Sequence, residues 1–428
     1  MVANSPLQVQ FRSFVKGHTS PELRTRVRQV LNLLTFHADR AKTIFNDRSP
    51  LRLKFTLTNY RGDDSVQGVE TPRLSFSEPM QDPDYDLLVA ERLIQSWQRS
   101  STRHGDVLGA GAVWQYRPLD TYGEMSELIA RNDPRALAEL LSPLFRTKLT
   151  SGMGMGDYEY QAVRKDPAGY ALTWHDRAIS LAVAVGESSL QCPEAGAFDT
   201  ALRADSRMAL RSVHNHCGDS VIRFPQIGGC FGVEVDGEVI PLNYLQQLYA
   251  AWRMRTLMGG QPWDGLEIGG GFGGLAYAAA QFGARRYTII DLPQVNVLQG
   301  WFLLHSDVRD RVVLFGEDAQ GRQDPIHIAC GGAIRDLPDR SYDIVVNQDS
   351  LPEMTQATAR EYLRHTSRIA RRFFLSLNQE HQAWGADRTP QNWVHALCRA
   401  EPDFELALFG RHPYWVRAGY VEELYVRW

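Results

Sequence analysis

Residues 263–274 read WDGLEIGGGFGG, a mainly apolar run that leads into a cluster of glycines. An alanine-rich segment follows at 275–282, and a second apolar run at 287–290 ends at Asp291. A strand, a glycine turn, a helix and a second strand that ends in an acid form one β-α-β unit, which can hold an adenine nucleoside. The glycines let the backbone approach such a ligand with torsion angles that a Cβ atom would forbid.

Two nucleotide-binding patterns fit this turn. The glycines that begin at Gly269 match the GxGxxG dinucleotide fingerprint, in which a pyrophosphate lies at a helix N-terminus. The spacing Glu267-x-Gly269-x-Gly271-x-Gly273 also resembles the first motif of class I S-adenosylmethionine-dependent methyltransferases. Because a carboxylate at Glu267 would repel a pyrophosphate, it favours the methyl donor. Asp291 can then accept hydrogen bonds from both ribose hydroxyls.

The C-terminal half continues the α/β pattern. Three further strands and a closing antiparallel pair are predicted at residues 311–315, 342–346, 373–377, 404–409 and 422–426. We therefore expect residues 226–428 to form a Rossmann-like domain of the class I methyltransferase type. Its sheet is expected to be seven-stranded and mostly parallel.

Residues 1–225 have a largely helical pattern. Helices are predicted near residues 87–98, 121–130 and 135–145, separated by glycine- and proline-containing breaks, and a strand is predicted at 51–58. Near the boundary, Asp236-Gly237 is a favoured two-residue hairpin turn between the runs 232–235 and 238–240. We expect residues 1–225 to be an accessory region that covers the acceptor site or mediates homodimerisation.

The composition is that of an ordinary globular protein. A length of 428 residues predicts two or three domains. A net charge of −4 with 43% apolar and 22% charged residues excludes a disordered chain and a histone-like DNA binder. No apolar run reaches the ~20 residues of a bilayer span, and no secretory signal pattern is present. We expect a cytoplasmic protein without a nucleic-acid or membrane partner.

Two further features bear on partners and metals. Residues 1–61 carry eleven basic and three acidic residues, which is either a solvated face or a docking surface for an acidic carrier protein or a second subunit. The five cysteines form no Cys-x-x-Cys pair, so neither a disulfide framework nor a thiolate zinc site is expected. The run of residues 214–217, HNHC, has metal-ligand residue types, but adjacent side chains at a helix end point in different directions. No metal site is predicted.

Three segments of the C-terminal half resemble the sugar O-methyltransferases of bacterial natural-product clusters. These segments are residues 266–274, residues 287–293 (YTIIDLP) and residues 343–354 (DIVVNQDSLPEM). The Phe145-Arg146 pair and the glycines of residues 152–156 are similar to the same family. The resemblance implies S-adenosylmethionine as cofactor and S-adenosylhomocysteine as product. It also implies an acceptor hydroxyl on a deoxysugar or a related metabolite.

The resemblance also implies which residues bind the cofactor. In this class of methyltransferases an acid or amide near the end of the third strand hydrogen-bonds the adenine amino group, and Asp318 holds that place after residues 311–315. The complete set of expected cofactor residues is Glu267, Gly269, Gly271, Gly273, Asp291, Leu292, Asp318 and Asn347.

Methyl transfer to a hydroxyl needs alignment of the reactants and a base that removes the proton. His381 is the first candidate for this base, because an imidazole titrates near neutral pH; the alternative is an exposed loop histidine. Asp349 or Glu353 would orient that histidine, act as the base instead, or hold a divalent cation, although Glu353 also fits a helix cap. Other residues after the fourth and fifth strands are candidates because acceptors bind over the strand ends. Ser350, Gln379 and His412 are the expected substrate-binding residues.

Three other functions stay open. The first is N- or C-methylation of a polyketide or peptide scaffold by the same cofactor. The second is an NAD-dependent oxidoreductase that uses the same glycine turn. The third is a non-catalytic module that binds the nucleoside for regulation or structure.

Overall fold

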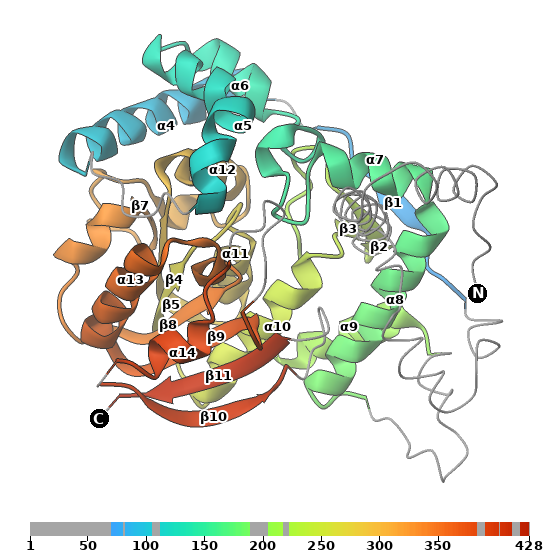
Figure 1. Cartoon of the computed structure of the whole chain (residues 1–428). Helices are drawn as coiled ribbons and strands as arrows, with labels where there is room; N and C mark the ends of the chain where they lie inside the picture. Colours follow the sequence, from blue (N-terminus) through green and yellow to red (C-terminus); the bar gives the residue numbers. More distant parts are fainter. Residues whose placement is uncertain are drawn as a thin grey trace, which may run out of the picture.

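The computed structural model describes residues 70–79, 82–104, 112–188, 204–216, 222–382, 390–401, 403–412 and 420–427, with the backbone alone for 112–120 and 216. The strand predicted at residues 51–58 and the basic segment 1–61 lie outside these ranges. None of the helices within them is both long and apolar enough to cross a membrane. Figure 1 shows a central sheet flanked by helices, beside a second group of helices.

The glycine turn lies in the β-α-β unit that its sequence predicts. β4 (Trp263–Ile268) is buried along its whole length, and the turn leads into α11 (Gly274–Gln281) and β5 (Ala284–Asp291). β4 pairs in parallel with β5 on one side and with β8 (Tyr342–Gln348) on the other. A strand between two parallel partners is covered on both faces, which explains the continuous burial of β4.

The large sheet has eight strands in the described residues, in the order β10-β11-β9-β8-β4-β5-β7-β6. Its remaining strands are β6 (Val312–Val313), β7 (Ile326–Cys330), β9 (Ala370–Gln379), β10 (Glu405–Arg411) and β11 (Tyr420–Val426). β11 is antiparallel to both β9 and β10, and the other pairs are parallel. The sheet therefore has the predicted Rossmann-like α/β class and the predicted closing antiparallel pair.

The predicted position of the third strand is wrong. The strand beside β5 is β7, and only two residues of the predicted strand at 311–315 form β6, at the edge of the sheet. The chain leaves β6 through Gly316, which has a φ of +81°, before it returns as β7. The Arg311 guanidinium holds this edge by donating to the carbonyls of Asp324 and Ala284. The sheet consequently has one strand more than the seven expected.

Helices cover both faces of this sheet. α10 (Tyr244–Leu257), α11 and α12 (Pro293–Leu304) pack on one face, and α13 (Gln356–Ile369) and α14 (Val394–Cys398) pack on the other. Side chains alternate along each strand, so Ile344 and Val346 of β8 belong to the first core and Val345 to the second.

The N-terminal region is mainly helical, as predicted. The structure extends the helices predicted near residues 87–98 and 121–130, and it ends the one predicted near 135–145 at Leu141. Three helices of this region begin with Asp-Pro, in which the aspartate accepts a hydrogen bond from a backbone N–H of the first turn and proline occupies the first position. The helices are α4 (Pro83–Arg103), α5 (Ala112–Ala130), α6 (Pro134–Leu141), α7 (Asp157–Lys165), α8 (Pro167–Ala184) and α9 (Ser206–Val213).

The predicted hairpin is confirmed. β2 (Phe231–Val235) and β3 (Glu238–Ile240) are antiparallel, and the φ angles of Asp236 and Gly237 are +55° and +86°. Positive φ at both central residues matches the twist of the flanking strands. β1 (Leu74–Phe76) adds to β2 and completes a small three-stranded sheet.

The N-terminal region and the large sheet share one hydrophobic core. Residues of α4, α6 and α8 belong to the same buried cluster as α10, α11 and α12. At the contact of α4 with α12, the Tyr85 hydroxyl donates to the Leu304 carbonyl at 2.7 Å. Arg92 forms two 2.9 Å hydrogen bonds with Glu317. These contacts fix α4 beside α12 and the segment after β6.

Candidate active site

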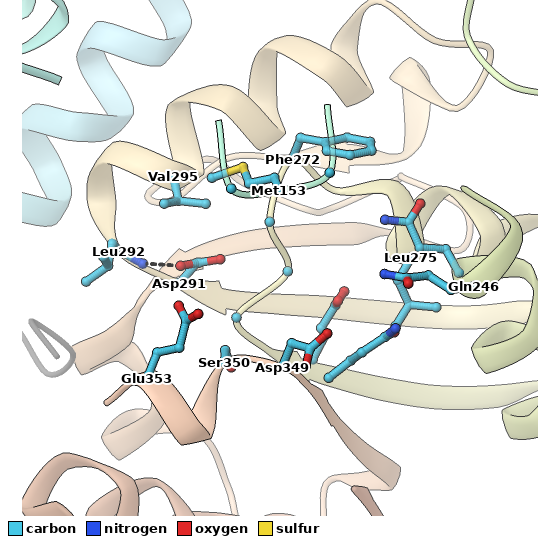
Figure 2. A pocket seen from close by; sticks show the side chains of 18 of the residues that line it. Met153, Gln246, Phe272, Leu275, Asp291, Leu292, Val295, Asp349, Ser350 and Glu353 are labelled. Atoms are coloured by element: carbon cyan, nitrogen blue, oxygen red, sulfur yellow. Dashed lines mark hydrogen bonds between the residues drawn. The ribbon is translucent and has the colours of Figure 1, made fainter. Parts of the chain in front are cut away.

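A cavity opens at the carboxyl ends of β4, β5 and β8, where open α/β sheets bind their ligands. Its lining comes from the glycine turn, the ends of β4 and β5, the segment after β8, α10, and the loop of residues 152–154. Figure 2 shows Asp291, Leu292 and Glu353 at one end and Gln246 with Leu275 at the other. Met153 lies opposite Asp349 and Ser350. The N-terminal region therefore forms part of the wall.

The glycine turn needs its glycines for two physical reasons. Gly269, Gly271 and Gly273 have φ angles of +78°, +54° and +98°, which L side chains rarely adopt. A Cβ atom on Gly269 would lie 2.2 Å from Cβ and Oγ of Ser350. Gly269 and Gly271 line the cavity, whereas Gly273 is the N-cap of α11 and a Cβ atom there would face Leu303.

Glu267 ends β4 with a carboxyl group that is almost fully buried. The side chain lines the cavity, and the Tyr287 hydroxyl donates to its Oε2 at 3.2 Å. Burial raises the pKa of Glu267 to about 8, and nearby Asp291 adds to the rise, against a lowering by the Tyr287 hydrogen bond. A cationic ligand beside Glu267 would therefore stabilise the ionised form of this carboxyl group.

Asp291 lies at the end of β5 and is held by several donors. Its Oδ1 accepts from the Leu292 N–H at 2.7 Å, and its Oδ2 accepts from Nε2 of Gln299 at 2.9 Å. Gln299, fully buried on α12, also donates to the Gly271 carbonyl at 2.9 Å, so one amide joins the acid to the glycine turn. Burial raises the pKa of Asp291 to about 7, although these hydrogen bonds oppose the rise. Gln299 was not among the residues predicted for this site.

Asn347 and Ser350 shape the glycine turn from the next strand. The Asn347 amide is fully buried, and it donates to the Ile268 carbonyl at 2.9 Å and to the Ser350 hydroxyl. The Ser350 hydroxyl donates to the same carbonyl at 2.8 Å. Ser350 lines the cavity but Asn347 does not, so Asn347 contacts the turn rather than a ligand.

Two acids after β8 line the cavity. Asp349 has a left-handed backbone with a φ of +64°, and its N–H donates to Oδ1 of Asn378 at 3.1 Å. Asn378 is itself buried and donates to Oδ1 of Asn347 at 3.0 Å. Glu353 lies one turn further on, and Figure 2 shows its carboxylate directed toward Asp291.

The cavity lining lacks five of the predicted site residues: Gly273 and Asn347, described above, and His381, His412 and Asp318. His381 is exposed and stacks on Trp393 with ring centroids 5.3 Å apart, because the chain turns outward after β9. His412 is buried, and its ring packs against Tyr249 at 4.7 Å. Asp318 follows the edge strand β6 and accepts a hydrogen bond from the Gln320 N–H. Because β7 takes the place beside β5, the prediction that Asp318 follows the third strand is corrected.

Gln379 lines the cavity as expected, and other polar residues join it that the sequence did not indicate. The Gln379 amide donates to Oε1 of Gln391 at 2.9 Å. Oε1 of Gln247 is buried and has no hydrogen-bond partner among the described residues. The lining residues that were not predicted include Met153, Asn243, Gln246, Gln247, Gln348, Gln391 and Tyr420. Their signal was weak, because they come from segments distant in sequence that only the fold brings together.

The described residues contain no group of three or more His, Cys, Asp or Glu side chains that could hold a metal ion. His214 and His216 lie in a short 3-10 helix, and Cys217 is outside the described residues. That the HNHC run binds no metal stays a prediction, because Cys217 and the side chain of His216 lie outside the described part of the chain.

No protein-family model matches the chain, and no curated protein matches it. Similar solved structures include the 1,6-didemethyltoxoflavin-N1-methyltransferase of Burkholderia thailandensis with bound S-adenosylhomocysteine, at 20% identity and a TM-score of 0.30, covering 42% of this chain and 78% of that one. The magnesium protoporphyrin IX methyltransferase of Synechocystis PCC 6803 with bound SAM is similar at 17% identity, TM-score 0.31 and coverages of 53% and 98%. The glycopeptide N-methyltransferase MtfA has 17% identity, TM-score 0.30 and coverages of 42% and 90%. Values this low assign neither a reaction nor a substrate to this chain.

Proposed function

We propose that the chain is an S-adenosylmethionine-dependent O-methyltransferase that acts on a hydroxyl of a small metabolite, a sugar or a glycosylated natural product. The observation that carries the proposal is the pair of acids, Glu267 and Asp291, at the ends of adjacent parallel strands around a turn where Gly269 leaves no room for a Cβ atom. A sulfonium nucleoside would place its ribose hydroxyls beside Asp291 and its positive charge near Glu267.

The residues present fit this cofactor. Asp291 would accept hydrogen bonds from the ribose, and Leu292 and Val295 offer apolar contact for the adenine ring. Oε1 of Gln247, buried without a described partner on the cavity wall, would accept from the ammonium of the amino-acid part. A dinucleotide would instead bring a pyrophosphate beside Glu267, and this negative charge would disfavour ionisation of the buried acid still further.

When bound, the cofactor supplies a methyl group on a positively charged sulfur, which the acceptor oxygen displaces in line. The chain must hold the acceptor and take its proton. We assign the role of general base to Asp349. Its carboxyl group lines the cavity, and its backbone N–H is held by a hydrogen bond to the Asn378 side chain. His381, exposed and stacked on Trp393, has no place in this step.

Residues 1–225 are proposed to be an accessory region that covers the site, with residues 226–428 as the methyltransferase domain. Met153 on the cavity wall supports the covering role. Homodimerisation, contact of residues 1–61 with an acidic carrier protein, and a cytoplasmic location remain predictions.

Calorimetric titration with S-adenosylhomocysteine and with NAD tests the cofactor assignment. We expect binding of the first compound alone; binding of NAD alone would show a dinucleotide site. Binding without turnover on any acceptor would favour the non-catalytic nucleoside-binding module.

The proton acceptor is tested with Asp349→Asn and His381→Ala. Asp349→Asn should lower kcat by about 10²–10⁴-fold with little change in cofactor affinity, which is the usual effect of removing a general base. His381→Ala should keep nearly the whole rate. The opposite pattern would return His381 to the mechanism and remove Asp349.

A further inference from the structure

A tyrosine on the neighbouring strand contacts the buried acid of the cofactor site. The Tyr287 hydroxyl, on a fully buried side chain of β5, donates to Oε2 of Glu267 at 3.2 Å. In the parallel register Glu267 lies opposite Ile289, so Tyr287 and Asp291 are its two diagonal neighbours on β5. Residues two apart on a strand point to the same face of the sheet. One face of β5 therefore presents a hydrogen-bond donor and an acid to Glu267.

The ring of Tyr287 is fixed by residues that precede Glu267 in β4. Gly265 lies directly opposite Tyr287 in the register, and a Cβ atom on Gly265 would lie 2.9 Å from Cδ2 of Tyr287 and 2.4 Å from Cζ3 of Trp263. The rings of Trp263 and Tyr287 pack edge to face with their centroids 6.0 Å apart. Glycine at position 265 therefore leaves space for both rings, and the tyrosine hydroxyl reaches Glu267 from a fixed ring.

The hydrogen bond matters because Glu267 is only 3% exposed. Burial raises the pKa of Glu267 to about 8 and Asp291 raises it further, whereas the Tyr287 hydrogen bond lowers it. Of these three influences, the Tyr287 hydroxyl is the one that favours the ionised carboxylate. Burial, and then the charge of Glu267, raise the pKa of Tyr287 well above its usual value, so the hydroxyl keeps the proton that it donates.

We propose, on the basis of the proposed function, that Tyr287 is a positioning residue of the cofactor site. Its hydroxyl orients the Glu267 carboxyl group and stabilises the ionised form, which pairs with the ammonium group of the cofactor. Tyr287 does not line the cavity, so it acts through Glu267. A neutral donor suits this place, because a buried cation would compete with the cofactor for the same carboxylate.

This role concerns only the amino-acid end of the cofactor. Asp291, which would hold the ribose, accepts from the Leu292 N–H and from Gln299. These two hydrogen bonds stay in place when the Tyr287 hydroxyl is removed. Adenosine, which lacks the amino-acid part, therefore separates the proposed role from a general loss of packing in the site.

The test is calorimetric titration of the full chain and of Tyr287→Phe with S-adenosylhomocysteine and with adenosine, at pH 7 and pH 9. Phenylalanine keeps the ring and removes the hydroxyl, and loss of a hydrogen bond to a buried carboxylate disfavours its ionisation about tenfold. We expect S-adenosylhomocysteine to bind Tyr287→Phe about tenfold more weakly than the parent at pH 7 and about twofold more weakly at pH 9, where Glu267 is largely ionised in the parent and about half ionised in the variant. The affinity for adenosine should change by less than about twofold.

Tyr342→Phe is the matched control. Tyr342 is 3% exposed on β8, its hydroxyl shares a 2.8 Å hydrogen bond with the Thr288 hydroxyl, and it does not line the cavity. This variant should leave both affinities unchanged at both pH values. In a Glu267→Gln background, Tyr287→Phe should change the affinity for S-adenosylhomocysteine by less than about twofold, since its effect requires an ionisable group at position 267.

Failure of S-adenosylhomocysteine to bind the parent protein would defeat the proposed function itself. With that binding intact, three results overturn only the present inference. They are an unchanged affinity of Tyr287→Phe for S-adenosylhomocysteine at pH 7, an equal loss of affinity for adenosine, and a loss of the same size at pH 7 and pH 9.

Discussion

Cofactor binding is expected to strengthen as the pH rises from 6 to 8. Glu267 is buried and Asp291 is half-buried, and their raised pKa values, about 8 for Glu267 and about 7 for Asp291, keep them partly protonated near neutral pH. A ribose hydroxyl pair and a cationic group both prefer the ionised acids. Binding should therefore lower both pKa values and release protons.

The size of the effect follows from these values. A group with a pKa of about 7 is ionised in roughly one tenth of the molecules at pH 6 and nine tenths at pH 8, so ionisation of Asp291 alone strengthens binding about tenfold. Glu267 changes from about one hundredth to one half ionised over the same interval. If both must ionise, the total rise is about 500-fold.

The assay is calorimetric titration of S-adenosylhomocysteine at pH 6, 7 and 8, in two buffers with different ionisation enthalpies. Proton release appears as a dependence of the measured enthalpy on the buffer. Adenosine, which lacks the amino-acid part, should show only the roughly tenfold rise that comes from Asp291. Asp291→Asn should abolish that rise. A constant affinity from pH 6 to 8, with no buffer dependence, would refute the reasoning.

Three further predictions concern the same site. Gln299→Leu removes a buried hydrogen bond to the Asp291 carboxylate, which is worth about 1.5–3 kcal/mol. Calorimetry should show S-adenosylhomocysteine binding about 10- to 100-fold more weakly, most strongly below pH 8, and an unchanged affinity would contradict the contact with Asp291. Gly269→Ala places a Cβ atom against Ser350 at a positive φ angle and should lower the free energy of unfolding, measured in urea, by about 1–3 kcal/mol. Adding Ser350→Gly should restore part of this stability, and equal stability of Gly269→Ala and the parent protein would contradict the packing. Glu267 has a pKa of about 8 in the folded protein, above the value of 4.5 for the unfolded chain, so the protein without cofactor loses unfolding free energy as the pH rises toward 8. Glu267→Gln should reduce this loss of stability in thermal melts, and an identical pH dependence of the melting temperature in both proteins would contradict the prediction.

The β-α-β unit could be predicted because its determinants are local. Glycines at fixed spacing, an alanine-rich helix and a strand that ends in Asp291 lie within thirty residues, and each of them needs only its neighbours in sequence. The same holds for the hairpin at Asp236-Gly237, where the turn type requires those residues.

The third strand could not be predicted because two short apolar runs compete for one place. Residues 311–315 and residues 326–330 both suit a strand, and tertiary packing decides that β7 lies beside β5. The assignment of Asp318 depended on that choice.

Side-chain direction beyond a strand end was also not readable from the sequence. His381 follows the end of β9 by only two residues, yet its ring turns away to Trp393. Gln299 contributes from the middle of a helix whose pattern is simply apolar, so its hydrogen bonds to Asp291 and Gly271 become visible only in three dimensions.

The position of Met153 limits how this chain can be engineered. The Asn243 amide donates to the Met153 carbonyl at 2.8 Å, and a Cβ atom on Gly154 would lie 2.5 Å from Cγ of Asn243, so the loop fits α10 closely. A chimera that joins residues 226–428 to the N-terminal half of another protein would keep the strands that line the cavity but would lose the loop of residues 152–154. Substrate specificity should therefore depend on the contact between the two halves rather than on either half alone.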